Sequence, residues 1–384
     1  MDGSILVRAN YPVFSGMSGN VGVFTPTIRS TTAIPSQTAT VVSNSTVSVA
    51  NGNSGNPSNL LYSTNGGVNW TSGGSGAGNY AFSNLVWNGT VFVAGTGTAN
   101  ASAYSTNGQN NWSAAGGNNT YINSMAANTS NGTVVAIQGT PVSGTVQIST
   151  NASTPSFSIL TMATGTANGV LANCVQVYTG TQFMIFGYTA AGQGYQYSST
   201  GASGTWTGVS IPPWGDAIVN SVASDGAGNV VIGIGGTSIA YASTNGGVTW
   251  RQTLLPGNLV YSTNSSMSCA NGKFFAALMS SNASSLMTNG DMAVSSDLLS
   301  WTYIPALSAS WISTNANYYT QVAYQGSNYI FVSQGASSLA NSQIITATED
   351  TTKMYLPTSR RQTAGTAILF NNGAANYQEW IKVQ

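Results

Sequence analysis

The chain has 384 residues, of which 42% are hydrophobic, so it can bury a large core and is expected to fold. Only 4% of the residues are charged, eight of each sign, which leaves no basic surface to neutralise nucleic-acid phosphates. Histidine, the usual general base near neutral pH and the commonest metal ligand, is absent. We therefore expect a protein that is not an enzyme, needs no cofactor or metal and does not bind nucleic acid.

The first residues, MDGSILVRANYPVF, carry an acidic residue where a signal peptide needs positive charge. Apolar runs stay well below the roughly 18 residues of a membrane span. We expect a chain made without a signal peptide and not inserted in a membrane. Cys174 and Cys269 fall in expected strands of different repeats, which predicts two buried thiols and no disulfide framework.

A short motif recurs along the chain. It reads YSTNGGVNW from Tyr62, YSTNGQNNW from Tyr104 and YASTNGGVTW from Tyr241, with weaker copies between and after these. The resulting units can be aligned on the residue before each turn, at Ser63, Ser105, Ser149, Ser198, Ser243, Ser295 and Thr346, with a period of 42 to 52 residues. A period of this length indicates a repeat architecture of seven units.

Each unit contains four extended segments. In the second unit they are Asn84–Trp87, Val91–Ala94, Ala103–Thr106 and a segment at Trp112, and the Asn-Gly pairs between them predict tight type I′ turns. Four short antiparallel strands repeated seven times are typical of a β-propeller. We predict an all-β protein with no helix, in which residues 37–357 form a seven-bladed β-propeller of four-stranded antiparallel blades.

The two ends differ from the repeats. Residues 1–36, with Pro12, Pro26 and Pro35, predict an extended N-terminal arm, and residues 358–384 predict a C-terminal β-hairpin or closing strands. A propeller has to close its ring to cover the edges of its sheets, and either end could supply the closing strand. The arm is therefore expected either to close the ring or to dock the protein to a larger assembly.

The recurring turn resembles the Asp-box (BNR) repeat of sialidase-like propellers, in which a short acceptor bonds turn amides, a glycine is left-handed and a Trp packs between sheets. Asn stands where that family usually has Asp, and Gln109 departs from its Gly. The matching residues are Ser63, Asn65, Gly67 and Trp70, then Ser105, Asn107 and Trp112, then Ser243, Asn245, Gly247 and Trp250, and more loosely Ser295, Asp297 and Trp301.

Ligand residues are expected on the face that carries the longer, variable loops, opposite the tight turns. The candidates there are Trp214, Asp216, Trp311, Tyr318 and Tyr319. The two tryptophans could be aromatic platforms for sugar rings. Alternatively, they could be linker aromatics packed between blades.

A sialidase active site is not expected, because the five arginines do not recur at matching positions of successive units. Asp216, Asp225 and Asp291 could form a carboxylate pair for glycoside hydrolysis, or they could simply cap turns. Glu349 and Asp350 are adjacent, so on a strand they would point to opposite faces.

The low charge, the surface rich in Ser, Thr, Asn and Gly, the turn motif and the ending YQEWIKVQ resemble virion-associated propeller proteins of tailed bacteriophages. The resemblance implies a tail-associated or surface-displayed structural protein located in the virion. Its partners would be other virion proteins, bound through residues 1–36, and host-surface glycan if it is an adhesin. The alternative is a carbohydrate-active or lectin-like propeller related to sialidases.

Overall fold

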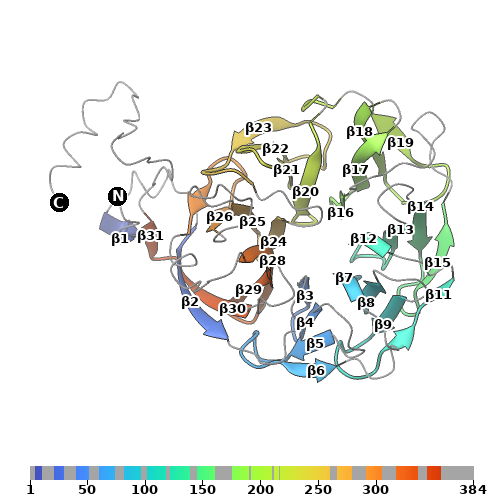
Figure 1. Ribbon diagram of the computed structural model, residues 1–384, viewed down its shortest axis with the longest axis horizontal. Coiled ribbons are helices and arrows are strands. Elements are labelled where there is room, and N and C mark those ends of the chain that lie inside the picture. The colour runs from blue at the N-terminus through green and yellow to red at the C-terminus, as the bar shows by residue number, and fades with distance from the viewer. Residues whose placement is uncertain are drawn as a thin grey trace.

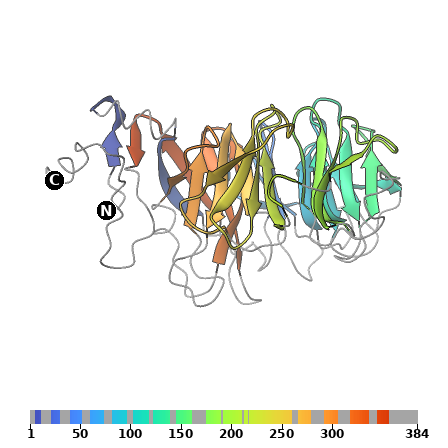
Figure 2. The same ribbon diagram turned by 90° about the horizontal axis from the view of Figure 1, so that it is seen from above.

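The computed structural model describes residues 5–10, 21–29, 40–51, 60–73, 82–96, 102–117, 122–138, 145–160, 175–189, 192–209, 212–215, 217–259, 266–278, 291–304, 317–335 and 344–355. These residues form a seven-bladed β-propeller (Figure 1), as the sequence predicts. Seen from the side, the blades make a disc (Figure 2).

Blades 1 to 4 follow one another along the chain. Blade 1 contains β3 (Val41–Ser43), β4 (Ser48–Asn51), β5 (Leu60–Ser63) and β6 (Thr71–Gly73), and blade 2 contains β7 (Phe82–Trp87), β8 (Phe92–Thr96), β9 (Ser102–Ser105) and β10 (Ser113–Ala114). Blade 3 contains β12 (Ile122–Ala127), β13 (Val134–Gln138), β14 (Thr145–Ser149) and β15 (Ser156–Ile159), and blade 4 contains β16 (Val175–Tyr178), β17 (Phe183–Thr189), β18 (Gly192–Ser198) and β19 (Thr207–Val209). A short strand β11 (Gly116–Gly117) adds to β15 in parallel.

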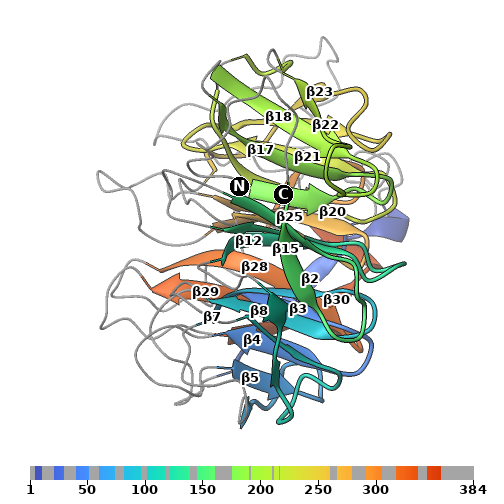
Figure 3. The ribbon, with the colours of Figure 1, turned by 90° about the vertical axis from the view of Figure 1, so that its right-hand side faces the viewer.

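Blades 5 to 7 complete the circle. Blade 5 contains β20 (Val219–Ser224), β21 (Val230–Ile234), β22 (Ile239–Ser243) and β23 (Arg251–Leu254), and blade 6 contains β24 (Met267–Ala270), β25 (Lys273–Leu278), β26 (Asp291–Ser295) and β27 (Thr302–Tyr303). Blade 7 contains β28 (Asn317–Gln325), β29 (Asn328–Gly335), β30 (Ile344–Asp350) and β2 (Val23–Arg29). The first strand of every blade lies near the central axis, next to the first strands of its neighbours (Figure 1). Figure 3 shows the disc from its rim.

The N-terminal region closes the ring. Strand β2 pairs antiparallel with β30 from Val23↔Asp350 to Arg29↔Ile344 and is the outer strand of blade 7. The propeller therefore includes residues within 1–36, whereas the sequence placed its start at residue 37. The expected C-terminal hairpin, residues 358–384, lies outside the described residues.

Outside the blades, strand β1 (Ile5–Val7) pairs antiparallel with β31 (Lys353–Tyr355), and a 3-10 turn, η1 (Arg8–Asn10), follows β1. This two-stranded sheet projects beside blade 7 (Figures 1 and 2). It is anchored because Met354 and Tyr355 are buried, Tyr355 in the core cluster between blades 6 and 7.

The hydrophobic core is divided among the junctions between blades. Each junction has its own cluster of apolar side chains contributed by two adjacent sheets. The aromatic residue after the third-strand turn of a blade packs on the preceding blade: Trp112, for example, belongs to the cluster that includes Val49 of blade 1, and Trp206 to the cluster that includes Val135 of blade 3. Burial of apolar surface between sheets, about 25 cal/mol for each Å², therefore holds the ring together.

The prediction of type I′ turns is wrong for the Asn-Gly pair at 88–89. Only Gly89 has a positive φ there, because Asn88 instead caps the turn: its Oδ1 accepts hydrogen bonds from the backbone N–H groups of Thr90 and Val91, at 2.9 and 2.7 Å. Asn271 and Gly272, both with positive φ, do follow the type I′ pattern.

Candidate functional site

Trp214, one of the expected ligand residues, belongs to the core. It lies in the linker between blades 4 and 5 and is only 6% exposed. Its ring centroid is 5.6 Å from that of Tyr195 and 5.4 Å from that of Trp250, one in each blade. Of the two interpretations of this tryptophan, the structure favours the linker aromatic packed between blades over the exposed sugar platform.

The other expected ligand residues are not brought together by the described part of the structure. Asp216 and Trp311 lie outside the described residues. Tyr318 and Tyr319 are adjacent on β28, the inner strand of blade 7, and only their backbone is described. A ligand site at these four residues stays a prediction.

Asp225 caps a turn, which is the structural role expected for it if it is not a catalytic carboxylate. Its Oδ1 accepts hydrogen bonds from the backbone N–H groups of Ala227 and Asn229, at 2.8 and 3.1 Å, and its Oδ2 accepts one from the Asn229 side chain at 2.6 Å. Asp216 and the side chain of Asp291 lie outside the described residues, so the structure does not pair Asp225 with either.

The recurring motif forms a hydrogen-bonded turn after the third strand, which we call the Ser-x-Asx turn. In blade 1, Oγ of Ser63 accepts a hydrogen bond from the backbone N–H of Gly67, at 2.9 Å. Oδ1 of Asn65 accepts one from the backbone N–H of Asn69, and Trp70 donates its indole N–H to the carbonyl of Gly67, both at 2.9 Å. Blade 5 repeats the first two bonds at Ser243 and Asn245.

In two other Ser-x-Asx turns the serine accepts its hydrogen bond from the N–H three residues on, not four. In blade 2, Ser105 accepts from the N–H of Gly108 and Asn107 from that of Gln109, which explains why Gln109 is tolerated. In blade 6, Ser295 accepts from the N–H of Leu298, which occupies the position of Gly108 with a φ of 64°. A leucine in the left-handed region is strained, because its Cβ crowds the backbone.

These turns also contact the preceding blade. A Cβ added at Gly67 would lie 2.9 Å from Cγ1 of Ile330 in blade 7, so glycine is required by space as well as by its φ of 78°. Asn328 of blade 7 donates to the carbonyl of Gly66 at 3.1 Å, and Gln182 of blade 4 donates in the same way to Gly246 at 2.8 Å. The Ser-x-Asx turns are therefore structural links between blades.

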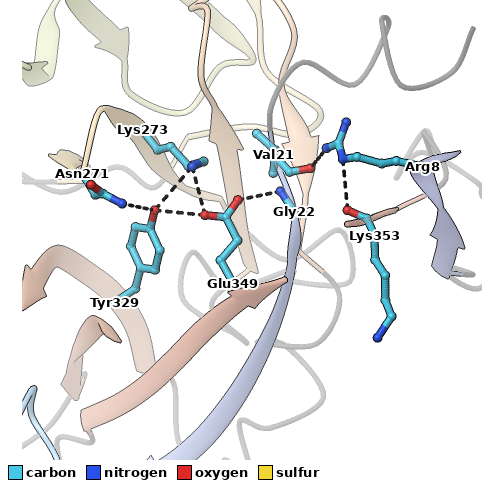
Figure 4. A network of polar contacts seen from close by, with 8 residues as sticks. All are labelled: Arg8, Val21, Gly22, Asn271, Lys273, Tyr329, Glu349 and Lys353. Atoms are coloured by element: carbon cyan, nitrogen blue, oxygen red, sulfur yellow. Dashed lines mark hydrogen bonds and ion pairs between the residues drawn. The ribbon is translucent and has the colours of Figure 1, made fainter. Parts of the chain in front are cut away.

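A group of charged and polar side chains, which we call the closure network, lies where β2 completes blade 7 (Figure 4). Lys273 of blade 6 and Glu349 of blade 7 form an ion pair of 2.9 Å, with their side chains 12% and 7% exposed. Tyr329 donates its hydroxyl to the Glu349 carboxylate at 3.1 Å, and the backbone N–H of Gly22 donates to the same carboxylate at 2.6 Å. Glu349 thus joins blade 6, blade 7 and the N-terminal segment.

Arg8 extends the closure network to the projecting sheet. Its guanidinium donates to the carbonyl of Val21 and, at 3.2 Å, to that of Lys353. Asp350 points away from Glu349 and forms an exposed ion pair with Lys353, as expected for adjacent residues on a strand. The sequence did not indicate this site, and its only signal is that charged residues, rare elsewhere, gather at residues 349–353.

Protonation at this junction is shifted by burial. Burial raises the pKa of Tyr329, and it raises the pKa of Tyr355 to about 12. The Tyr355 hydroxyl accepts from the backbone N–H of Phe24 at 2.9 Å and donates to its carbonyl at 3.2 Å. Burial likewise raises the pKa of the Cys269 thiol to about 12, so this cysteine, which forms no disulfide, is a poor nucleophile.

Within the described ranges, no three His, Cys, Asp or Glu side chains gather as metal ligands would. The same part of the chain holds no helix that is long and apolar enough to cross a membrane. Near the closure network, the large apolar side chains of Ile5 and Val7 on β1 are 53% and 45% exposed.

Neither the protein-family models nor the curated proteins give a match to the sequence. Solved β-propellers do match the structure. A streptogramin B lyase structure has a TM-score of 0.58 at 8% identity, covering 85% of this chain and 98% of the other. YCF48 bound to D1 peptide has 0.55 at 12%, covering 86% and 100%, and an ancestral GH74 enzyme has 0.52 at 14%, covering 79% and 44%. At these identities the likeness shows the propeller fold alone.

Proposed function

We propose that this protein is a non-enzymatic structural component of a bacteriophage particle, tail-associated or displayed on its surface, that serves virion assembly. The composition supports this role, because a disc with 4% charged residues and no histidine changes little in charge with its surroundings. We assign the Ser-x-Asx turns to the Asp-box type. Their residues are used to join blades, which suits a rigid scaffold better than a catalyst.

The observation that carries the proposal is the projecting sheet of β1 and β31. Ile5 and Val7 present apolar side chains to solvent, and within the described residues β1 has a strand on one side only. Exposed strand edges with apolar side chains are templates for another chain, and soluble proteins usually cover them. We propose that another virion protein pairs with β1, so that docking uses this strand and not the whole of residues 1–36.

Replacing Ile5 and Val7 together by Ser tests the docking proposal. Both side chains are about half exposed, so the fold should persist, whereas incorporation of the protein into purified particles should fall by tenfold or more. Val248→Ser is the matched control, because Val248 is 73% exposed on a Ser-x-Asx turn and should not affect incorporation. Quantitative mass spectrometry of the particles gives the readout.

Two outcomes would contradict the proposal. If the wild-type chain is absent from purified particles, it is not a virion component. If it is present and the double Ser variant is incorporated normally, docking uses another surface.

Host-surface glycan binding is the extension of the proposal, and Tyr319→Ala is its test. Glycan cleavage that is lost on Asp216→Asn or Asp291→Asn would instead support the carbohydrate-active alternative.

A further inference from the structure

Two glutamine side chains are buried in the junction between blades 3 and 4. Gln176 on β16 and Gln196 on β18 are 7% and 4% exposed. Both pair with Ile185 of β17, one from each side, so the three residues form a row across blade 4. Directly paired residues of an antiparallel sheet point to the same face, and hence both amides lie on the face that carries Ile185.

That face packs on an apolar surface. Ile185 belongs to the cluster that includes Val135, Ile137 and Ile148 of blade 3. Aliphatic side chains of this kind provide no donors or acceptors for a glutamine. Both the oxygen and the nitrogen of the Gln176 amide, and the oxygen of the Gln196 amide, are buried without a hydrogen-bond partner among the described residues.

The next row on the same face carries no side chains on β17 and β18. It consists of Gly187 and Gly194, which pair with each other directly. Because side chains alternate between faces along a strand, Gly187 is the next residue after Ile185 on this face, and Gly194 the next beside Gln196. The two amides therefore border two described residues, Gly187 and Gly194, that project no side chain toward blade 3.

Leaving three buried amide atoms unpaired would destabilise the fold, and native proteins satisfy such groups, with water where no protein group is near. A water molecule is the ligand that matches the chemistry, because Gln176 offers both a donor and an acceptor and a water can use both. We propose that the junction of blades 3 and 4 contains an internal hydration site, in which ordered water bridges the amides of Gln176 and Gln196.

A crystal structure at a resolution that shows ordered water tests this directly. We expect density for one or more waters at about 2.7 to 3.2 Å from the Gln176 amide, with a further bond to Gln196 or to backbone. A dry junction, or a direct hydrogen bond between the two glutamines, would overturn the proposal.

Stability measurements provide an independent test. With bridging water, Gln196→Leu leaves the water and Gln176 short of a partner, so the folding equilibrium constant should fall about fivefold or more. The double variant with Gln176→Leu removes both amides and should recover part of that loss. In a dry junction, Gln196→Leu replaces an unpaired amide with an apolar group and would be neutral or stabilising, which would refute the hydration site.

Discussion

Leu298 is the residue at which backbone and packing requirements oppose each other. Its φ of 64° suits glycine, while its side chain is 1% exposed in the core between blades 5 and 6. We predict that Leu298→Ala lowers the free energy of unfolding by about 2 to 4 kcal/mol through lost packing. Leu298→Gly should be more stable than Leu298→Ala by about 1 kcal/mol, because glycine adopts this backbone without strain.

Urea denaturation of the two variants measures this difference. Leu278 provides the control, since it is fully buried in strand β25 and has no positive φ. At Leu278 the order should be reversed, with the Gly variant less stable than the Ala variant. The same order at both sites would show that strain at Leu298 is negligible.

Tyr355 contributes to a loss of stability at alkaline pH. Its pKa is raised to about 12 in the fold, against about 10 in an unfolded chain, so the folded state favours the neutral phenol. This contribution is fully present below pH 10 and is lost as the pH rises from 10 to 12, by about 2 to 3 kcal/mol. Tyr329 and Cys269, whose pKa values are also raised, act in the same direction.

Tyr355→Phe checks the assignment. The variant should be less stable at pH 7, because it loses the hydrogen bonds to Phe24, but its stability should fall less steeply above pH 10. Thermal melting of both proteins between pH 7 and 11.5 gives the two slopes. Equal slopes would place the alkaline transition elsewhere.

Among the elements, β25 of blade 6 and β30 of blade 7 are joined by the ion pair between Lys273 and Glu349. Removing one partner of a buried ion pair leaves the other uncompensated, and Glu349→Ala should lower the free energy of unfolding by about 3 to 5 kcal/mol. Replacing Lys273 by Met and Glu349 by Leu together should be much less damaging, because neither charge is then left buried.

The exposed pair of Asp350 and Lys353 is the matched control for this experiment. Both side chains are more than a third exposed, so Asp350→Asn should change stability much less than Glu349→Ala. Chemical denaturation of all three variants separates these cases. If Glu349→Ala were as mild as Asp350→Asn, the closure network would not hold the blades together.

The sequence was sufficient to predict the repeated element because each blade repeats the same local chemistry. Ser63, Ser105, Ser243 and Ser295 end third strands, and each also accepts a hydrogen bond from a turn amide, a role that the motif gives only to the Asn or Asp two residues later. It did not identify the closing strand, because pairing between Val23 and Asp350 joins segments far apart in sequence and no local pattern records it. Trp214 shows the same limit. A tryptophan in a linker can be a sugar platform or a core residue, and only its packing in the fold decides between them.

At the scale of the whole molecule, the ring requires β2 but not β1. A variant lacking residues 1–10 keeps β2 and should unfold cooperatively, with a modest loss of stability from Leu6 and Arg8. A variant lacking residues 1–29 leaves β30 as an open edge and uncovers the core around Phe331, so it should aggregate or fail to fold. Circular dichroism and size-exclusion chromatography distinguish the two.

Should the shorter deletion also abolish folding, the projecting sheet would be part of the closure and not an appendage. A folded protein lacking residues 1–29 would show that three strands suffice for blade 7. Either result would change which variants can be used to study docking.

The pairing of β2 with β30 also has a consequence for biosynthesis. On the ribosome, Val23 emerges long before Asp350, its partner in the final sheet. Blades 1 to 6 can form in order as they leave the exit tunnel, but β2 has to wait for almost the entire chain to be translated. Throughout that interval an unpaired β-strand is present in the nascent protein, where chaperones or neighbouring nascent chains can reach it.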